Sequence, residues 1–247
     1  MMRSLAFAMI VAAIPFVALA GETVNYTVNG EAFEDYKAKA AGQSKGLVLV
    51  IHDWDGLTEY EHKRADMLAS MGYDAFAVDL YGKGNRSVET GAKKAETGKL
   101  YRNRDRMHSL ILGDLSETRK SSPGKAVVMG YCFGGAASLE LARSGKASDI
   151  AGYASFHGGL KTPAGQSCAK STPPLLIAHG GPDKAISMDQ VANLSKELEA
   201  AGVMYEMQVY SGAPHALTVI GSKRYRKVAD EHSWDAFSDF LVDNLGT

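Results

Sequence analysis

Six short, nearly continuous apolar runs constrain the fold of this chain more than any other feature of the sequence. They cover residues 46–51, 75–78, 126–129, 150–155, 175–178 and 204–209. Runs without polar alternation are typical of strands that helices cover on both faces. The segments between them supply candidate helices at 60–71, 107–120, 135–144, 188–201 and 225–245. The sequence therefore predicts an α/β fold with a mostly parallel central sheet covered by helices on both faces.

The region before the first of these runs has a different pattern. Residues 23–28 and 32–38 alternate polar and apolar side chains and are joined by Asn29-Gly30. This dipeptide tolerates the positive φ angles of a tight hairpin turn. We expect an N-terminal antiparallel hairpin near one edge of the sheet.

The first twenty residues look like a targeting segment. Arg3 precedes an apolar run from Leu5 to Leu19, and Ala18-Leu19-Ala20 forms a small-x-small cleavage site before Gly21. The sequence predicts a signal peptide at 1–20, one mature domain at 21–247, and export to the periplasm or the medium. A retained membrane anchor is the alternative, but the run is shorter than the roughly 20 residues that a spanning helix needs.

Charge and cysteine content narrow the classes of partner and scaffold. Lys plus Arg number 27 and Asp plus Glu 28, so the formal net charge of -1 provides no field to attract nucleic acid. A small neutral or weakly charged ligand fits this chain better.

With two cysteines, Cys132 and Cys168, the fold cannot depend on a disulfide scaffold. Pairing of these two cysteines remains an alternative that would silence thiol chemistry at Cys132.

The sharpest chemical motif is Gly130-Tyr131-Cys132-Phe133-Gly134-Gly135, between the run at 126–129 and a helix that starts near Gly135. Its G-x-C-x-G core is the strand-turn-helix elbow of a nucleophile, with Cys in place of Ser. A helix N-terminus would favour the thiolate and lower the pKa of Cys132. The alternative is a tight glycine-rich turn around an inert buried cysteine.

Two further residues complete a candidate triad in the order nucleophile, acid, histidine. Asp183 follows the run at 175–178, and His215 follows the run at 204–209. His215 would take the thiol proton of Cys132 while Asp183 orients the imidazole. The backbone N–H groups of Phe133 and Trp54 are the expected oxyanion donors.

The remaining histidines are weaker candidates. His52, His157 and His179 end strands and could line the site, whereas we expect three on helices to face solvent: His62, His108 and His232. None of these histidines shows zinc-ligand spacing such as H-E-x-x-H, so the sequence implies no metal.

Several motifs in one order resemble the dienelactone hydrolase family. They are Ile51-His52-Asp53-Trp54-Asp55-Gly56-Leu57, Val78-Asp79-Leu80-Tyr81-Gly82, the 130–135 elbow, His179-Gly180-Gly181-Pro182-Asp183 and Gly212-Ala213-Pro214-His215. The resemblance implies an α/β-hydrolase fold, a monomer without cofactors, and hydrolysis of lactones or activated esters by the cysteine triad. Such an enzyme is a carboxylic ester or lactone hydrolase of the carboxymethylenebutenolidase type.

The sequence departs from the family pattern at two places. Asp53 stands where the family usually has a glutamate that contacts the thiol and helps to activate it. Residues 216–219 lack the arginine that binds the substrate carboxylate in the type enzyme, although Lys83 could occupy another anion-contact position. An uncharged acyl ester or a different lactone is therefore as compatible as dienelactone. The alternative from another class is a non-catalytic binding or redox-sensing protein on a hydrolase scaffold.

Overall fold

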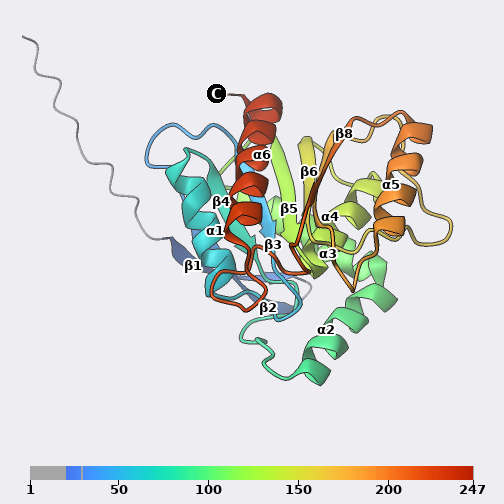
Figure 1. Ribbon diagram of the computed structural model, residues 1–247. Helices are drawn as coiled ribbons and strands as arrows, with labels where there is room; N and C mark the ends of the chain where they lie inside the picture. The colour runs from blue at the N-terminus through green and yellow to red at the C-terminus, as the bar shows by residue number, and fades with distance from the viewer. Residues whose placement is uncertain (1–20, 29, 247) are drawn as a thin grey trace, which may run out of the picture.

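The computed structural model describes residues 21–28 and 30–246, and it consists of one twisted sheet between layers of helices (Figure 1). The predicted signal peptide at 1–20 and the turn residue Asn29 lie outside the described residues. The strands are β1 Glu22–Val28, β2 Glu31–Ala38, β3 Leu47–Ile51, β4 Asp74–Val78, β5 Ala126–Tyr131, β6 Ile150–Phe156, β7 Leu175–Gly180 and β8 Tyr205–Tyr210. The helices are α1 Glu59–Ser70, α2 Thr90–Arg102, α3 Arg104–Arg119, α4 Phe133–Ser144, α5 Met188–Ala201 and α6 Lys227–Leu245. Within the described ranges, no helix is both long enough and apolar enough to cross a membrane.

The eight strands pair in the order β1-β2-β4-β3-β5-β6-β7-β8. From β4 to β8 all neighbours in this order are parallel, whereas β1 pairs antiparallel with β2 and β2 antiparallel with β4. The predicted mostly parallel sheet and N-terminal hairpin are therefore confirmed. Gly30 has a φ of 84°, the positive value that a tight hairpin turn needs.

Helices cover both faces of the sheet (Figure 1). On one face, Val48 and Val50 of β3 belong to an apolar cluster that also contains Leu68 of α1 and Phe237 of α6. On the other face, the alternate side chains of β3 belong to a second cluster with residues from α2, α3, α4 and α5. Because successive side chains of a strand point to opposite faces, every residue of β3 is buried. Burial on both faces explains the apolar runs without polar alternation.

The structure corrects the sequence-based elements in two places. The run at 204–209 forms β8, an edge strand, and Met204 and Val209 are 74% and 45% exposed. The expectation of cover on both faces is wrong for this strand, because none of its residues is buried. Helix α2 was not predicted from the sequence. Leu100 is the single buried residue of this helix, so no apolar stripe marks the helix in the sequence.

The chain connectivity places a crevice beside β3. The chain passes from β3 to β4 on one side of β3, and then returns to pair β5 on the other side. Parallel sheets bind ligands outside the carboxyl ends of their strands at such a switch point. Asp53 lies two residues after β3, and Cys132 directly follows β5, so both belong to this crevice.

Candidate active site

Cys132 lies in a strained turn between β5 and α4. Its φ of 49° and ψ of -106° are unusual for a residue other than glycine. A Cβ on Gly134 would lie 2.2 Å from the carbonyl oxygen of Ile51, and a Cβ on Gly130 would lie 2.2 Å from the carbonyl carbon of Gly134. The glycines of the motif therefore allow helix α4 to approach β3 and β5 closely, which presents the Cys132 side chain above the sheet.

The three residues of the candidate triad lie together. His215 Nε2 is 3.1 Å from Cys132 Sγ, and His215 Nδ1 is 2.8 Å from Asp183 Oδ2. The other carboxylate oxygen of Asp183 accepts hydrogen bonds from the backbone N–H groups of Ala185 and Ile186 at 2.8 and 3.0 Å. Burial opposes ionisation of Asp183, but the bonds from His215 and from these amides keep its pKa below the ordinary value. Asp183 is therefore held as a carboxylate that orients the imidazole.

Asp53 lines the same cavity as Cys132, and its carboxylate is near enough to act on the thiol. Burial and then the charge of Asp53 raise the pKa of Cys132 well above its ordinary value. The backbone N–H of Phe133 acts in the opposite direction but is outweighed. The expectation that the helix N-terminus lowers this pKa is thus wrong for this arrangement. Burial likewise raises the pKa of Asp53 to about 6.

The loop after β3 holds the second expected oxyanion donor. The backbone N–H of Trp54 donates to Asp53 Oδ1 at 2.5 Å, so this donor already has a partner. Glu61 in the first turn of α1 holds this loop through hydrogen bonds. One of its carboxylate oxygens accepts from the N–H of Asp53 at 3.2 Å, and the other accepts from the N–H and hydroxyl of Thr58 at 2.9 and 2.8 Å.

A cavity of about 350 Å³ opens over the triad. It is lined by Asp53, Trp54, Thr97, Tyr101, Cys132, Phe133, Gly159, Ala185, Ile186, His215, Ala216 and Arg224. Its walls are mostly apolar, and helix α2, which the sequence did not predict, supplies Thr97 and Tyr101. The cavity has the size and lining of a site for a small organic molecule.

Comparison with known proteins identifies the family of this chain. The family model of the dienelactone hydrolase family matches residues 33–245. The chain belongs to the dienelactone hydrolase family. Protein usf of Aquifex pyrophilus is 28% identical over 234 residues, which cover 91% of this chain and 99% of that protein. A provisionally named carboxymethylenebutenolidase of Aquifex aeolicus is 27% identical over 205 residues, which cover 79% of this chain and 86% of that protein.

Solved structures show the same fold. A dienelactone hydrolase-like promiscuous phosphotriesterase from metagenomic libraries superposes with a TM-score of 0.80 at 24% sequence identity. The match covers 91% of this chain and 98% of that one. At this identity, the likeness shows an α/β-hydrolase fold and nothing finer.

The cation that lines the cavity of this member of the dienelactone hydrolase family is Arg224, not the expected Lys83. Lys83 lies outside the cavity lining, because its Nζ donates to Asn25 at 2.6 Å and is 3.9 Å from Glu34. The predicted substrate contact by Lys83 therefore has no support from its position. The cavity nevertheless contains a cation, Arg224, in the loop before α6. Its sequence position gave no signal, because the loop conformation decides which side chain faces the site.

Four of the other six histidines of this family member are buried, and none of the six lines the cavity. His52, His157 and His179 are at most 1% exposed, and burial lowers the pKa of each. The ring of His157 packs against His215 with centroids 5.3 Å apart. His108 is also buried, so the expectation that it faces solvent is wrong. It lies on the inward face of α3, whose buried residues also include Met107 and Ile111.

Both cysteines are free. Cys168 is buried in the apolar cluster on the α4 side of the sheet. The alternative of a Cys132–Cys168 disulfide is therefore wrong for this structure. Over the part of the chain that the structure describes, no group of three His, Cys, Asp or Glu side chains is arranged to hold a metal ion.

Proposed function

We propose that this protein is a hydrolase that cleaves carboxylic ester or lactone bonds through a thioester on Cys132. The observation that carries the proposal is the continuous line of hydrogen-bond contacts from Cys132 Sγ through both nitrogens of His215 to Asp183, at 3.1 and 2.8 Å. Cys132 and His215 line a cavity of the size that a small ester needs. Membership of the dienelactone hydrolase family supports the same reaction class.

In the first half of the proposed reaction, the thiol proton of Cys132 passes to His215 Nε2 as the sulfur attacks the substrate carbonyl carbon. The imidazolium that forms lies beside the Asp183 carboxylate, which stabilises its charge. His215 then donates the proton to the leaving alkoxide, the carbon–oxygen bond breaks, and a thioester remains on Cys132.

In the second half, a water molecule attacks the thioester carbonyl and gives a proton to His215. The carbon–sulfur bond breaks, and the proton returns to the departing thiolate. The sum is one ester or lactone and one water converted to a carboxylic acid and an alcohol, with Cys132 and His215 restored.

Asp53 keeps both the thiol and one oxyanion donor inactive until a substrate binds. Its carboxylate accepts the Trp54 N–H that a developing oxyanion needs, and its charge raises the pKa of the Cys132 thiol. A substrate carbonyl oxygen that takes over the Trp54 N–H would displace Asp53 and complete a donor pair with Phe133. The thiol is then activated where a substrate is present, which protects it from other electrophiles.

Pre-steady-state kinetics with a nitrophenyl ester test the proposal. Wild-type protein should release a burst of nitrophenol equal to the enzyme concentration, followed by slower turnover, and Cys132→Ala should show neither. Cys168→Ala is the matched control, because it removes the other free thiol from the core, and it should keep the burst. Equal rates in wild type and Cys132→Ala would favour the alternative of a non-catalytic binding or redox-sensing protein.

We also propose that residues 1–20 are a signal peptide, so that the mature enzyme acts outside the cytoplasm on esters or lactones before their uptake. Intact mass of the protein from periplasmic and cytosolic fractions tests this. A periplasmic chain that begins at Gly21 is expected, and a full-length chain confined to the cytosol would contradict the proposal.

A further inference from the structure

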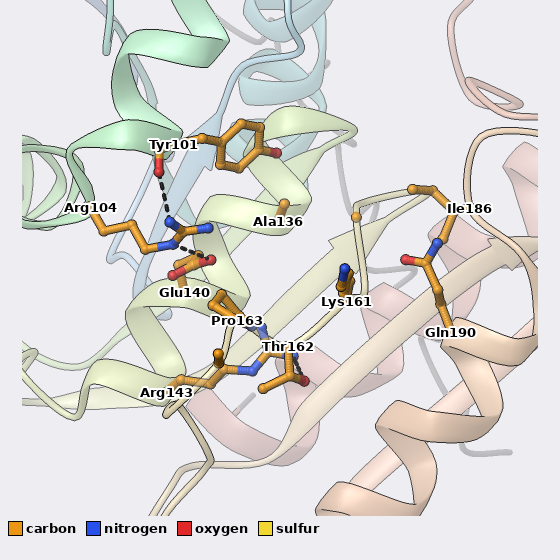
Figure 2. Close-up of a pocket in the computed structure, with 12 residues that line it drawn as sticks. Tyr101, Arg104, Ala136, Glu140, Arg143, Lys161, Thr162, Pro163, Ile186 and Gln190 are labelled. Atoms are coloured by element: carbon orange, nitrogen blue, oxygen red, sulfur yellow. Dashed lines mark hydrogen bonds and ion pairs between the residues drawn. The ribbon is translucent and has the colours of Figure 1, made fainter.

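A second cavity adjoins the one over the triad (Figure 2). Its volume is about 710 Å³, and Tyr101, Gly159 and Ile186 line both cavities. A ligand that passes these shared residues would therefore extend from Cys132 into the second cavity. A compact lactone is small enough to stay in the first cavity, so the second cavity calls for a longer substrate.

The second cavity has a different lining from the first. It contains three cationic side chains, Arg104, Arg143 and Lys161, and one acidic side chain, Glu140. In the view of Figure 2, Lys161 lies between the Arg104–Glu140 pair and Gln190 of α5. A polar group fits this lining better than the end of an alkyl chain.

Both arginines are held by partners within the protein. Arg104 Nε is 3.0 Å from Glu140 Oε1, and its terminal nitrogen donates to the carbonyl oxygen of Tyr101 at 2.7 Å. Arg143, whose side chain is 2% exposed, lies 3.3 Å from Glu197 and donates to Thr162 at 3.1 Å. Each arginine charge is therefore matched by a carboxylate, and the two pairs form fixed walls.

Lys161 differs from the two arginines because it has no carboxylate partner among the described residues. Its side chain is exposed, and among residues 21–28 and 30–246 it has neither an ion pair nor a side-chain hydrogen bond. Gln190, on the α5 side of the cavity, likewise makes no side-chain hydrogen bond to another described residue. A free ammonium and a free amide on the cavity wall can each donate to a negatively charged group, and a carboxylate matches the charge of Lys161.

We propose that the second cavity is a subsite for the far end of an extended ester that terminates in a carboxylate, with the ester at Cys132 and the carboxylate at Lys161. The inference rests on the proposed esterase function and adds the length and charge of the substrate. It differs from carboxylate binding inside the first cavity, where Arg224 is the available cation. The two sites predict opposite dependence on chain length.

Nitrophenyl monoesters of succinic, adipic and suberic acid, each paired with the ester of its ω-amide, test the subsite. The amide has nearly the shape of the acid but no charge, so the ratio of kcat/KM between the two reports recognition of charge. Enzyme-free rates are subtracted, because a nearby carboxylate speeds spontaneous hydrolysis. Wild type should favour the acid about three- to fivefold for the longer chains at low ionic strength, and should show little preference for succinate.

Lys161 variants then assign the preference. Lys161→Gln should bring the ratio for the longer chains close to one, and Lys161→Glu should invert it. Lys63→Gln is the matched control, because Lys63 is an exposed lysine on α1 away from both cavities, and it should keep the wild-type ratio. A ratio that survives in Lys161→Gln but is lost in Arg224→Gln would overturn the subsite and place the carboxylate in the first cavity.

Direct binding separates failure of the subsite from failure of the esterase proposal. If wild type hydrolyses no ester, calorimetric titration with free suberate still tests the second cavity. Saturable binding to wild type that weakens at least threefold in Lys161→Gln supports the subsite, and equal or absent binding in both overturns it. If esters are hydrolysed in a Cys132-dependent way without preference for charge, the subsite is wrong and the esterase proposal stands.

Discussion

The backbone N–H of Trp54 donates a hydrogen bond to the side chain of the preceding residue, Asp53, at 2.5 Å. The charge of the same carboxylate raises the pKa of the Cys132 thiol. One side chain thus restrains both the expected nucleophile and an expected oxyanion donor. Replacement of its charge should change thiol reactivity and protein stability in directions that can be stated in advance.

Asp53→Asn should make Cys132 more reactive toward iodoacetamide in the absence of substrate. Loss of the negative charge lowers the pKa of the thiol, so more thiolate is present at a given pH. Peptide-resolved mass spectrometry after timed alkylation measures the rate, with the buried Cys168 as an internal reference. An unchanged or slower rate at Cys132 would show that Asp53 does not suppress the thiol.

Asp53→Asn should also stabilise the fold at neutral and alkaline pH. The pKa of Asp53 rises from 3.8 to about 6 on folding because the carboxyl is buried. A raised pKa means that the folded state loses stability relative to the unfolded state as the pH rises through this interval. The variant should be more stable than wild type by about 3 kcal/mol at pH 8. Urea unfolding should show this gap closing toward pH 4, and a gap independent of pH would contradict the assignment.

The candidate triad could be predicted because each member lies in the turn or loop after a strand. Strands were recognisable as apolar runs, and parallel strands bring their carboxyl ends to one edge, so Cys132, Asp183 and His215 had to lie near one another. The glycines around Cys132 added a local signal, since only a tight elbow requires them.

The residues that line the two cavities could not be predicted from the sequence, and the reasons are physical. Helix α2 buries little of its surface, so it lacks the apolar period that reveals a helix. Arg224 and Lys161 lie in loops, where position depends on the whole fold rather than on local pattern. Burial and the charge of Asp53 set the pKa of the Cys132 thiol, and the sequence alone reveals neither the burial of the thiol nor the position of Asp53.

Gly134→Ala should destabilise the protein severely. Its Cβ would lie 2.2 Å from the carbonyl oxygen of Ile51, a backbone atom that cannot move without separating α4 from β3. We expect a loss of about 3 kcal/mol or more in the free energy of unfolding. Gly91→Ala in α2 is the control, because nothing in the described structure lies within 4 Å of that Cβ. It should be neutral or stabilise by up to about 1 kcal/mol. Similar losses in both variants would contradict the close approach.

Thr218 should position His215 through its hydroxyl group. Thr218 Oγ1 lies 2.8 Å from His157 Nε2 and 2.6 Å from the Tyr60 hydroxyl, and the His157 ring packs on His215. Thr218→Val should lower kcat about tenfold with little change in KM, because the histidine loses its fixed orientation.

Thr218→Ser keeps the hydroxyl and should retain most of the wild-type kcat. Unfolding curves of both variants separate positioning from loss of structure. If Val and Ser reduce kcat equally, or if KM changes instead, the hydroxyl does not act through His215.

The most direct test of the central claim is the mass of the enzyme caught during turnover. Wild-type residues 21–247 mixed with a nitrophenyl ester and quenched in acid within the burst should gain the mass of one acyl group, mapped to the peptide that contains Cys132. Cys168→Ala should give the same adduct. An adduct on another residue, or turnover with no acyl adduct on Cys132, would contradict the thioester mechanism.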